Sequence, residues 1–217
     1  MLFKSILLYF YERRIMKIIN ILKKELYKRF LRIKLKNKDF SVIASNCNGG
    51  CILSDLGVKF NTPTINLFFY PDDFFKFVSN IEQYLKYELV EKKSDENYPV
   101  GCLNDIKIYF VHYNSFEEAK EKWDLRKKRI NYNNLFIMST DRDGCTYDQI
   151  KKFNNLPYKN KIMFTHKPYP EFESCYYIEG FEDEDSVGIL LEYIKDTGKR
   201  YLHQFDFVKW FNDGYKK

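Results

Sequence analysis

Residues 41–57 read SVIASNCNGGCILSDLG, and this stretch decides the fold class of the chain. Residues 41–45 form a short β-prone run, and residues 51–56 have the apolar spacing of a short helix that ends at Gly57. A small glycine-containing turn, residues 46–50, connects them. Strand, turn and helix in this order are typical of α/β proteins, where the turn brings backbone N–H groups to an anionic ligand. Because the spacing matches neither G-x-G-x-x-G nor a G-K-[ST] ending, the turn predicts either a phosphate or sugar-nucleotide site or a tight bend that needs glycine.

Strand-like and helix-like segments alternate through the rest of the chain. The other predicted strands are residues 64–69, 87–91, 106–113, 135–140, 161–166 and 176–181. The other predicted helices are residues 72–86, 116–130, 146–154, 186–195 and 204–212. This alternation implies right-handed crossovers. It predicts an α/β fold with a mostly parallel sheet, helices on both faces and Rossmann-like layers. The polar residues 91–99 are expected to form a surface loop.

The net charge of +6 belongs to an N-terminal arm. Residues 1–38 hold twelve Lys and Arg and two acids, whereas residues 39–217 hold 24 Lys and Arg against 28 Asp and Glu. A nucleic-acid-binding body usually carries its own basic face, so nucleic acid is not an expected partner. We therefore divide the chain into a basic helical arm, residues 1–38, and an α/β domain, residues 39–217.

The arm has the pattern of a basic amphipathic helix. From Met16 onward its apolar residues recur at helical spacing, at Ile18, Ile19, Leu22, Leu26, Phe30 and Ile33. Such a helix docks on an anionic membrane surface or a membrane-bound partner, or it packs on its own domain with a solvated basic face. The opening apolar run is too short for the roughly 20 residues that span a bilayer. We expect a cytoplasmic protein with peripheral membrane contact through residues 1–36.

The cysteines suggest a reducing compartment. They are odd in number, scattered and without a C-x-x-C pair: Cys47, Cys51, Cys102, Cys145 and Cys175. No disulfide framework is expected. With only three histidines and no zinc-ligand spacing, no structural metal site is assigned. Cys47 is a candidate nucleophile, with His112 at the end of a predicted strand as its base. The alternative is a buried apolar Cys47 and a structural His112.

Charged groups follow two other predicted strands. Residues 140–144 read TDRDG, and an Asp-x-Asp pair at a carboxyl strand end can hold a divalent cation that neutralises a diphosphate, although Asp and Gly are also ordinary turn residues. Asp141 is a candidate base. Thr165, His166 and Lys167 follow the next strand and either belong to the same anion site or are ordinary loop residues.

The predicted helix at residues 116–130 has the clearest boundaries in the chain. Ser115 and Glu118 form a capping box at its start. Lys122, Arg126 and Arg129 follow one side of it as a cationic ridge. This ridge is a candidate partner for the phosphate groups of a donor.

Three blocks, residues 45–85, 98–138 and 153–168, resemble the bacterial family called domain of unknown function 1919. The family pattern S-N-N-C-x-G-G is matched with one Asn missing, at Asn46, Cys47, Gly49 and Gly50. A second pattern, H-Y-x-S-x-E-E-A-x-x-K-W-x-x-R-x-x-R-I-N, is matched from residue 112 to residue 131. Members are often labelled exopolysaccharide or capsule biosynthesis proteins. The resemblance implies an α/β fold and a role in cell-surface polysaccharide assembly, and it implies no particular reaction.

Together these features predict a glycosyltransferase with a nucleotide-sugar donor and a glycan acceptor, which can be lipid-linked. The general base is His112 or Asp141. The residues expected to bind substrate are Asn46, Asn48, Gly49, Gly50, Lys122, Arg126, Arg129, Asn131, Thr165 and Lys167. The one cofactor that the sequence suggests is a divalent cation. The alternatives are a transferase of acyl or other groups that acts through Cys47 or His112, and a noncatalytic binding protein of the polysaccharide machinery.

Overall fold

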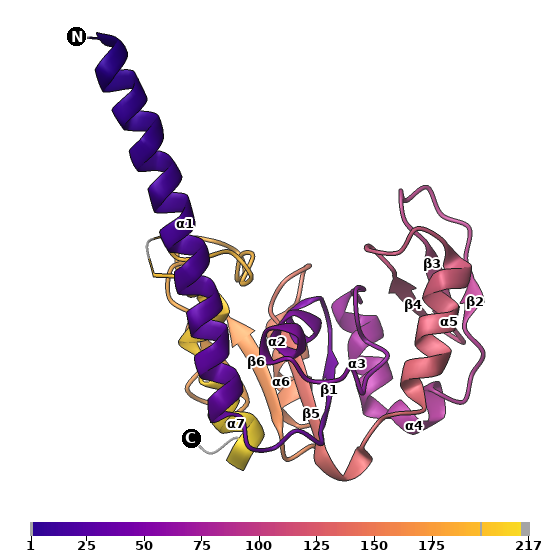
Figure 1. Cartoon of the computed structure of the whole chain (residues 1–217). Helices are drawn as coiled ribbons and strands as arrows, with labels where there is room; N and C mark the ends of the chain where they lie inside the picture. Colours follow the sequence, from indigo (N-terminus) through magenta and orange to yellow (C-terminus); the bar gives the residue numbers. More distant parts are fainter. Residues whose placement is uncertain (1, 196, 214–217) are drawn as a thin grey trace.

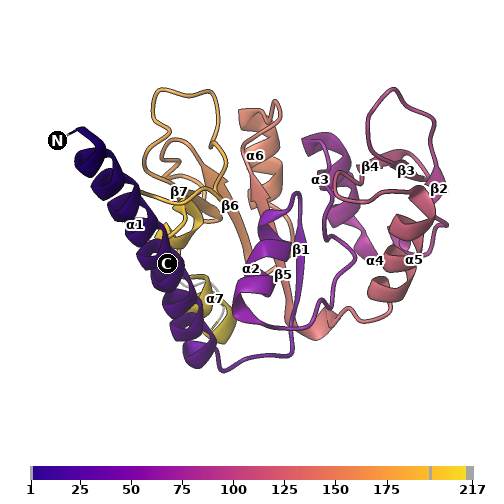
Figure 2. The ribbon, with the colours of Figure 1, turned by 45° about the horizontal axis from the view of Figure 1, so that its top comes forward.

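The computed structural model describes residues 2–195 and 197–213 and confirms the α/β class (Figure 1). Its central sheet is parallel, in the order β1 (Ser41–Ala44), β5 (Leu135–Thr140), β6 (Lys161–Thr165), β7 (Cys175–Tyr177). A second, antiparallel sheet contains β2 (Val90–Glu91), β3 (Val100–Leu103) and β4 (Ile106–Tyr109). Figure 2 shows the N-terminal helix and the antiparallel sheet at opposite ends of the molecule.

Helices cover both faces of the parallel sheet, as predicted. One face packs against α1 (Leu2–Lys34), α2 (Asn48–Leu56) and α7 (Phe207–Asp213). The other face packs against α3 (Pro71–Ser79) and α6 (Tyr147–Asn154). Neighbouring residues of one strand therefore enter different cores: Val42 belongs to the first and Ile43 to the second. Burial on both faces explains why these strands are apolar throughout instead of alternating with polar residues.

The remaining helices are short or lie beside the antiparallel sheet. They are α4 (Ile81–Tyr84), α5 (Phe116–Lys127) and two 3₁₀ turns, η1 (Tyr132–Asn134) and η2 (Tyr201–Gln204). The Ser115 hydroxyl accepts from the Glu118 amide and so caps α5 as predicted. The segment predicted as one helix at residues 72–86 is two, because the chain leaves the helical conformation at Asn80.

The predicted placement of two strands in the parallel sheet is wrong. Residues 87–91 and 106–113 contribute β2 and β4 to the antiparallel sheet, and β3 between them was not predicted. The sequence does contain a hairpin signal here, the two-residue connection Asn104 and Asp105. Asn104 has φ of 54° and closes a tight hairpin between β3 and β4. The predicted loop at residues 91–99 connects β2 and β3, except that its first residue, Glu91, still pairs with Gly101 as the end of β2.

Residues 64–69 lie along β1 but form no regular strand. The Ala44 amide donates to the Thr64 hydroxyl at 3.0 Å, and the Phe69 amide donates to the Ser45 carbonyl at 2.9 Å. Between them Asn66 has φ of 61°, which interrupts the extended conformation. This segment occupies the edge of the sheet beyond β1, so the chain continues on one side of β1 before it returns to β5 on the other.

Residues 186–195 are not the predicted helix. Their backbone groups are used elsewhere: the Leu202 amide donates to the Leu190 carbonyl at 3.0 Å, and the Ile194 amide donates to the Lys199 carbonyl at 2.8 Å. The apolar residues Val187 and Leu190 still enter the core beside α2. An apolar pattern of helical spacing therefore reflected burial here and not helix formation.

The predicted N-terminal helix is present as α1 and docks by its C-terminal half. Leu31 and Leu35 are buried, and the Arg32 guanidinium donates to the Asp55 carbonyl at the end of α2 at 2.8 Å. Lys28 lies 3.5 Å from the Asp55 carboxylate. Within the described residues, no helix combines the length and the apolar character that crossing a bilayer requires.

The two glycines of the family motif lie inside α2, not in a turn before it. A Cβ on Gly49 would lie 2.7 Å from the Cβ of Ala44 on β1, closer than two carbon atoms can pack. A Cβ on Gly50 would lie 3.3 Å from the terminal methyl of Ile65, which can move. Gly49 is therefore required by the close approach of helix and strand.

We expect Gly49→Ala to lower the free energy of unfolding by about 1–3 kcal/mol through overpacking. Gly50→Ala is the matched control in the same helical turn, where the gain in helix propensity, about 1 kcal/mol, offsets the milder contact. Urea unfolding of both variants measures the difference. Equal stability of the two variants would contradict the packing explanation.

His203, in η2, contacts the part of α1 that packs on the domain. Its ring lies 4.8 Å from the Tyr27 ring, and its Nδ1 accepts from the Arg200 amide at 2.9 Å. Burial, followed by the charges of Arg200 and Lys199, lowers the pKa of His203 from 6.5 to about 4. The imidazole is therefore neutral in the folded protein at pH 7.

Acidification is expected to weaken the fold through His203. In the unfolded chain this imidazole takes up a proton as pH falls through its ordinary pKa of 6.5, whereas in the folded chain it does so only near 4. Stability present above pH 6.5 is thus lost between those values, about 3 kcal/mol. Urea unfolding at several pH values measures this slope. His203→Asn keeps an acceptor for the Arg200 amide and should flatten the slope; an unchanged slope would assign it to other groups.

Candidate functional site

The carboxyl ends of β1 and β5 form a topological switch point. The chain leaves β1 into α2 on one face of the sheet, and it leaves β5 into α6 on the other face. Open α/β sheets bind ligands in the crevice that such diverging connections create. Across this crevice the side-chain nitrogen of Asn46, Nδ2, donates a hydrogen bond to the Thr140 hydroxyl at 3.2 Å. This bond connects the ends of the two strands.

A cavity of about 230 Å³, the strand-end pocket, lies at this crevice. Its polar lining comes from the two loops that follow β1 and β5, namely Asn46, Cys47, Asn48, Arg142 and Asp143. Apolar side chains close it, among them Phe68 and Leu190. The volume is below the roughly 300–1,000 Å³ of pockets for drug-sized ligands, and it suits one or two phosphate groups.

Three features give the strand-end pocket an affinity for anions. The first is the start of α2, where Asn46 Oδ1 accepts from the Asn48 amide at 3.1 Å, while the N–H groups of Gly49 and Gly50 have no acceptor within the helix. The second is the Asn48 side chain, which is only 6% exposed and has no hydrogen-bond partner among the described residues. The third is Arg142, whose guanidinium has no ion pair within the described part of the chain. A helix N-terminus beside an arginine is a favourable setting for phosphate.

One strand further along, Asp141 and His166 form a buried pair. Asp141 ends β5 and His166 follows β6, and the imidazole Nδ1 lies 2.5 Å from Asp141 Oδ2. The same oxygen accepts from the His166 amide at 2.8 Å, and Oδ1 accepts from the Val187 amide at 2.8 Å. The imidazole is therefore held in one orientation. Its other nitrogen, Nε2, has no hydrogen-bond partner among the described residues, which is the arrangement of a general base with its orienting carboxylate.

The structure brings part of the predicted site together. Asn46 and Asn48 line the strand-end pocket, and Gly49 and Gly50 continue from it into the first turn of α2. Asp141 is close by, but its oxygens point to His166 and Val187, so it orients an imidazole and is not itself free to act as a base.

The cationic ridge of α5 is engaged with its own surroundings. Arg126 donates to the Tyr113 hydroxyl at 2.7 Å and lies over the Phe60 ring at 5.6 Å. Lys122 pairs with Glu121 at 3.3 Å. None of these contacts reaches the loops at the carboxyl ends of β1 and β5, so a role of Lys122, Arg126 and Arg129 in donor binding stays a prediction.

Three other predicted substrate residues lie apart from the strand-end pocket. The Asn131 amide donates to the Ser41 hydroxyl at 2.9 Å, at the amino ends of the strands and so at the opposite edge of the sheet. The Thr165 hydroxyl is buried and donates to the Lys167 carbonyl at 2.8 Å. The Lys167 ammonium is exposed and lies 5.8 Å from the Tyr169 ring.

His112 and Cys47 lie near the pocket without the features that their proposed chemistry needs. β4 ends at Tyr109, so His112 is not at a strand end, and its side chain is exposed beside Val111, which lines the pocket. The Cys47 thiol faces the Leu67 carbonyl at 3.7 Å, and burial raises the pKa of Cys47 to about 11. The thiol is therefore protonated at neutral pH, whereas a nucleophilic cysteine needs the thiolate.

The Asp-x-Asp pair does not converge on one point. Asp141 is buried, whereas Asp143 is exposed on a turn with φ of 61°. Among the described residues, no group of three or more His, Cys, Asp and Glu side chains is placed to hold a metal ion.

Two residues of this site, His166 and Arg142, were not assigned from the sequence. Each follows the end of a buried strand, His166 directly after β6 and Arg142 two residues after β5. This position at a carboxyl strand end is the sequence feature that could have marked them as site residues. His166 was recognised only as one member of a polar cluster, because its pairing with Asp141 joins residues 25 positions apart.

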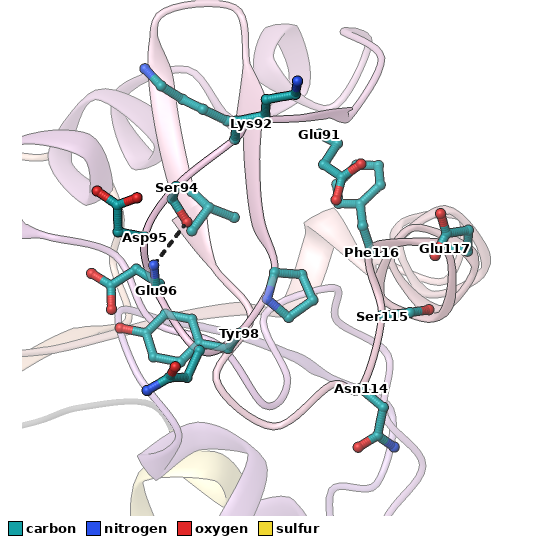
Figure 3. Close-up of a pocket in the computed structure, with 14 residues that line it drawn as sticks. Glu91, Lys92, Ser94, Asp95, Glu96, Tyr98, Asn114, Ser115, Phe116 and Glu117 are labelled. Atoms are coloured by element: carbon teal, nitrogen blue, oxygen red, sulfur yellow. Dashed lines mark hydrogen bonds between the residues drawn. The ribbon is translucent and has the colours of Figure 1, made fainter.

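A larger open hollow of about 750 Å³ lies between the loop at residues 91–99 and the start of α5 (Figure 3). Four carboxylates and two lysines line it, so its charge does not favour an anion. Its Tyr98 continues into an aromatic cluster that reaches the strand-end pocket at Phe68, with ring centroids of Phe68 and Tyr98 6.5 Å apart. The cluster consists of Phe68, Tyr70, Tyr98 and Tyr109, in which Phe68 stacks on Tyr109 at 4.8 Å.

Comparison with known proteins shows the family. The model of the family described as Domain of unknown function (DUF1919) matches residues 18–212. A Haemophilus influenzae protein described as "Uncharacterized protein" is 50% identical over 184 residues, which cover 85% of this chain and 89% of that protein. The chain therefore belongs to the DUF1919 family, as its sequence motifs predicted.

Proposed function

We propose that this member of the DUF1919 family is a glycosyltransferase that binds a nucleoside-diphosphate sugar at the strand-end pocket. It would pass the sugar to a hydroxyl group of a glycan during the assembly of cell-surface polysaccharide, the role that the family resemblance implies. The observation that carries the proposal is the combination of an arginine without an ion pair among the described residues, the Asn48 side-chain amide and a helix N-terminus at one switch point.

The donor diphosphate fits the strand-end pocket in size, and Arg142 offsets the one carboxylate of the lining, Asp143. Arg142 offers a planar fork of donors that suits phosphate oxygens, and the buried Asn48 amide offers two more N–H groups. The aromatic cluster beside the pocket supplies ring faces on which a base or sugar ring of the donor can stack.

The Asp141–His166 pair supplies the proton transfer that the reaction needs. Transfer to a hydroxyl requires removal of its proton as the new bond forms, and an imidazole with a free Nε2 performs this near neutral pH. The pair lies at the same edge of the sheet as the pocket, one strand away. The alternative of covalent transfer through Cys47 has less support, because burial raises the pKa of its thiol to about 11.

The proposal is tested by measuring binding of nucleotide sugars and of inorganic pyrophosphate to the purified chain by calorimetry. Arg142→Gln should weaken binding about tenfold or more, since a hydrogen bond to a charged group contributes about 1.5–3 kcal/mol. Arg13→Gln is the matched control, an exposed arginine on α1 away from the strand-end pocket, and should change affinity less than about twofold.

Three results would decide against the proposal. A folded protein that binds neither pyrophosphate nor any nucleotide sugar excludes this donor class. Equal weakening by both arginine variants would show a nonspecific charge effect. Loss of turnover in Cys47→Ser with unchanged donor binding would point to covalent chemistry through the thiol.

A further inference from the structure

The outer face of α1 carries an apolar stripe that the rest of the chain leaves uncovered. This outer stripe consists of Ile15, Ile19, Leu22, Leu26, Phe30 and Ile33, whose exposed fractions run from 37% to 75%. Exposed apolar residues scattered singly are normal, but a continuous row along one helix marks an interaction surface.

Most of the outer stripe does not face the domain; only Phe30, near its C-terminal end, borders a hollow of about 220 Å³ beside η2 and α7. The helix docks through Leu31 and Leu35, which are about half a turn away from Leu26 around the helix axis. Figure 1 shows the first half of α1 extending past the rest of the molecule. The contacts of α1 with residues 193–199 begin at Lys23 and Lys24, and side chains 13–19 before them are exposed. α1 thus has a covered apolar face at Leu31 and an open one along the outer stripe, while Met16 and Ile21 are exposed off the stripe.

The spacing of the outer stripe fits both a helical partner and a flat surface. Ile15 and Leu22 are seven residues apart, and so are Ile19, Leu26 and Ile33, which is the repeat of a coiled coil as well as a row along a straight helix. The choice between the two partners therefore rests on charge.

The charge around the stripe indicates the chemistry of that surface. α1 contains ten Lys and Arg and two Glu. Arg29 borders the stripe, whereas Arg13, Arg14 and Lys17 lie more than a quarter-turn from its centre line; all four are exposed and have no carboxylate partner among the residues that the structure describes. Pairing of the stripe with that of a second copy would bring two cationic helices together, and their charges would repel each other. Anionic lipid head groups attract the same charges.

We propose that α1 lies in the plane of an anionic lipid bilayer, with the outer stripe at the boundary of the acyl chains and the free cations at the head groups. The domain then lies on the side of the helix that faces away from the bilayer, where Leu31 and Leu35 are buried against it. Its loops after β7 touch α1 directly, so the carboxyl edge of the parallel sheet is held close to the membrane. This inference goes beyond the proposed reaction and does not depend on it.

The test is co-sedimentation of the full chain with vesicles of phosphatidylcholine, alone or with about 30 mol% phosphatidylglycerol. The protein should bind the anionic vesicles and not the neutral ones, and added salt should weaken the binding. The double variant Leu22→Ser, Leu26→Ser should bind about tenfold more weakly or worse. Both side chains are exposed, 56% and 65%, so the thermal unfolding of the domain should not change.

Ile21→Ser is the matched control, because it removes an equally exposed apolar side chain, 60%, from the same turn but off the stripe. It should bind as the unaltered chain does. The proposal fails if the unaltered protein ignores anionic vesicles, or if both variants bind equally. A dimer in solution that is lost in the double variant, without vesicle binding, would assign the stripe to a second copy and also overturn it. Donor binding at the strand-end pocket is measured without vesicles, so the two proposals fail independently.

Discussion

Replacing His166 by asparagine is expected to lower the rate of sugar transfer by about 10²–10⁴-fold, the usual contribution of a positioned general base. The asparagine amide can still donate to Asp141, and the backbone amide of residue 166 keeps its own bond to the same carboxylate. The fold and donor affinity should therefore be retained while the proton acceptor is lost. The measurement is turnover with a donor that binds, together with the affinity of the variant for the same donor.

His112→Asn is the comparison that separates the two candidate bases. His112 is exposed, and the described residues place no carboxylate against its ring. We expect it to retain turnover within about twofold, since most exposed positions tolerate substitution. If His112→Asn removed activity and His166→Asn did not, the base would be His112 and the Asp141–His166 pair would be structural.

Asp141→Asn is expected to cost about 1.5–3 kcal/mol of unfolding free energy, the range for hydrogen bonds to a buried charged group. The Asp141 carboxylate is 3% exposed and accepts three hydrogen bonds, from the amide and ring of His166 and from the Val187 amide. Asparagine has the same shape, but its NH₂ group would face an N–H donor at one of these positions. These bonds connect the ends of β5 and β6 to the segment after β7. The loss of stability should therefore appear in the global unfolding of the domain. Urea unfolding measures it.

Asp143→Asn is the control from the same Asp-x-Asp pair. Asp143 is exposed at φ of 61°, a conformation that asparagine tolerates as well as aspartate. Its stability should change by less than about 0.5 kcal/mol. Equal destabilisation of the two variants would contradict the view that only Asp141 has a structural role. Equal loss of a metal-dependent activity would instead support the divalent-cation hypothesis.

Most of the parallel sheet could be predicted, because local sequence and burial agree there. The strands at residues 41–44, 135–140 and 161–165 are apolar on both faces, and each is followed by a polar strand end. Where the local sequence pattern and the observed backbone conformation disagree, the predicted secondary structure is wrong. Residues 186–195 are apolar at helical spacing, but their backbone pairs with residues 199–202, and residues 64–69 are β-prone but contain Asn66 at positive φ.

The candidate site could be predicted only in part, for a similar reason. The position of Asn46 and Asn48 follows from one continuous strand–helix stretch. The pairing of Asp141 with His166 and the separation of Asn131 from the pocket depend on which strands are neighbours and on which edge each loop emerges. Neighbouring strands are chosen by long-range packing, which no local pattern records.

The sequence by itself determined the α/β class, the family, the basic helical arm and the acidic body, because periodicity, motif spacing and charge are local properties of the chain. The tertiary structure decided which residues meet. It placed Arg142 beside the N-terminus of α2, held His166 against Asp141, and turned the apolar stripe of α1 away from the domain. The physical reason is that a helix or strand specifies its own faces, whereas the partner of each face depends on how all the elements together bury their apolar surface.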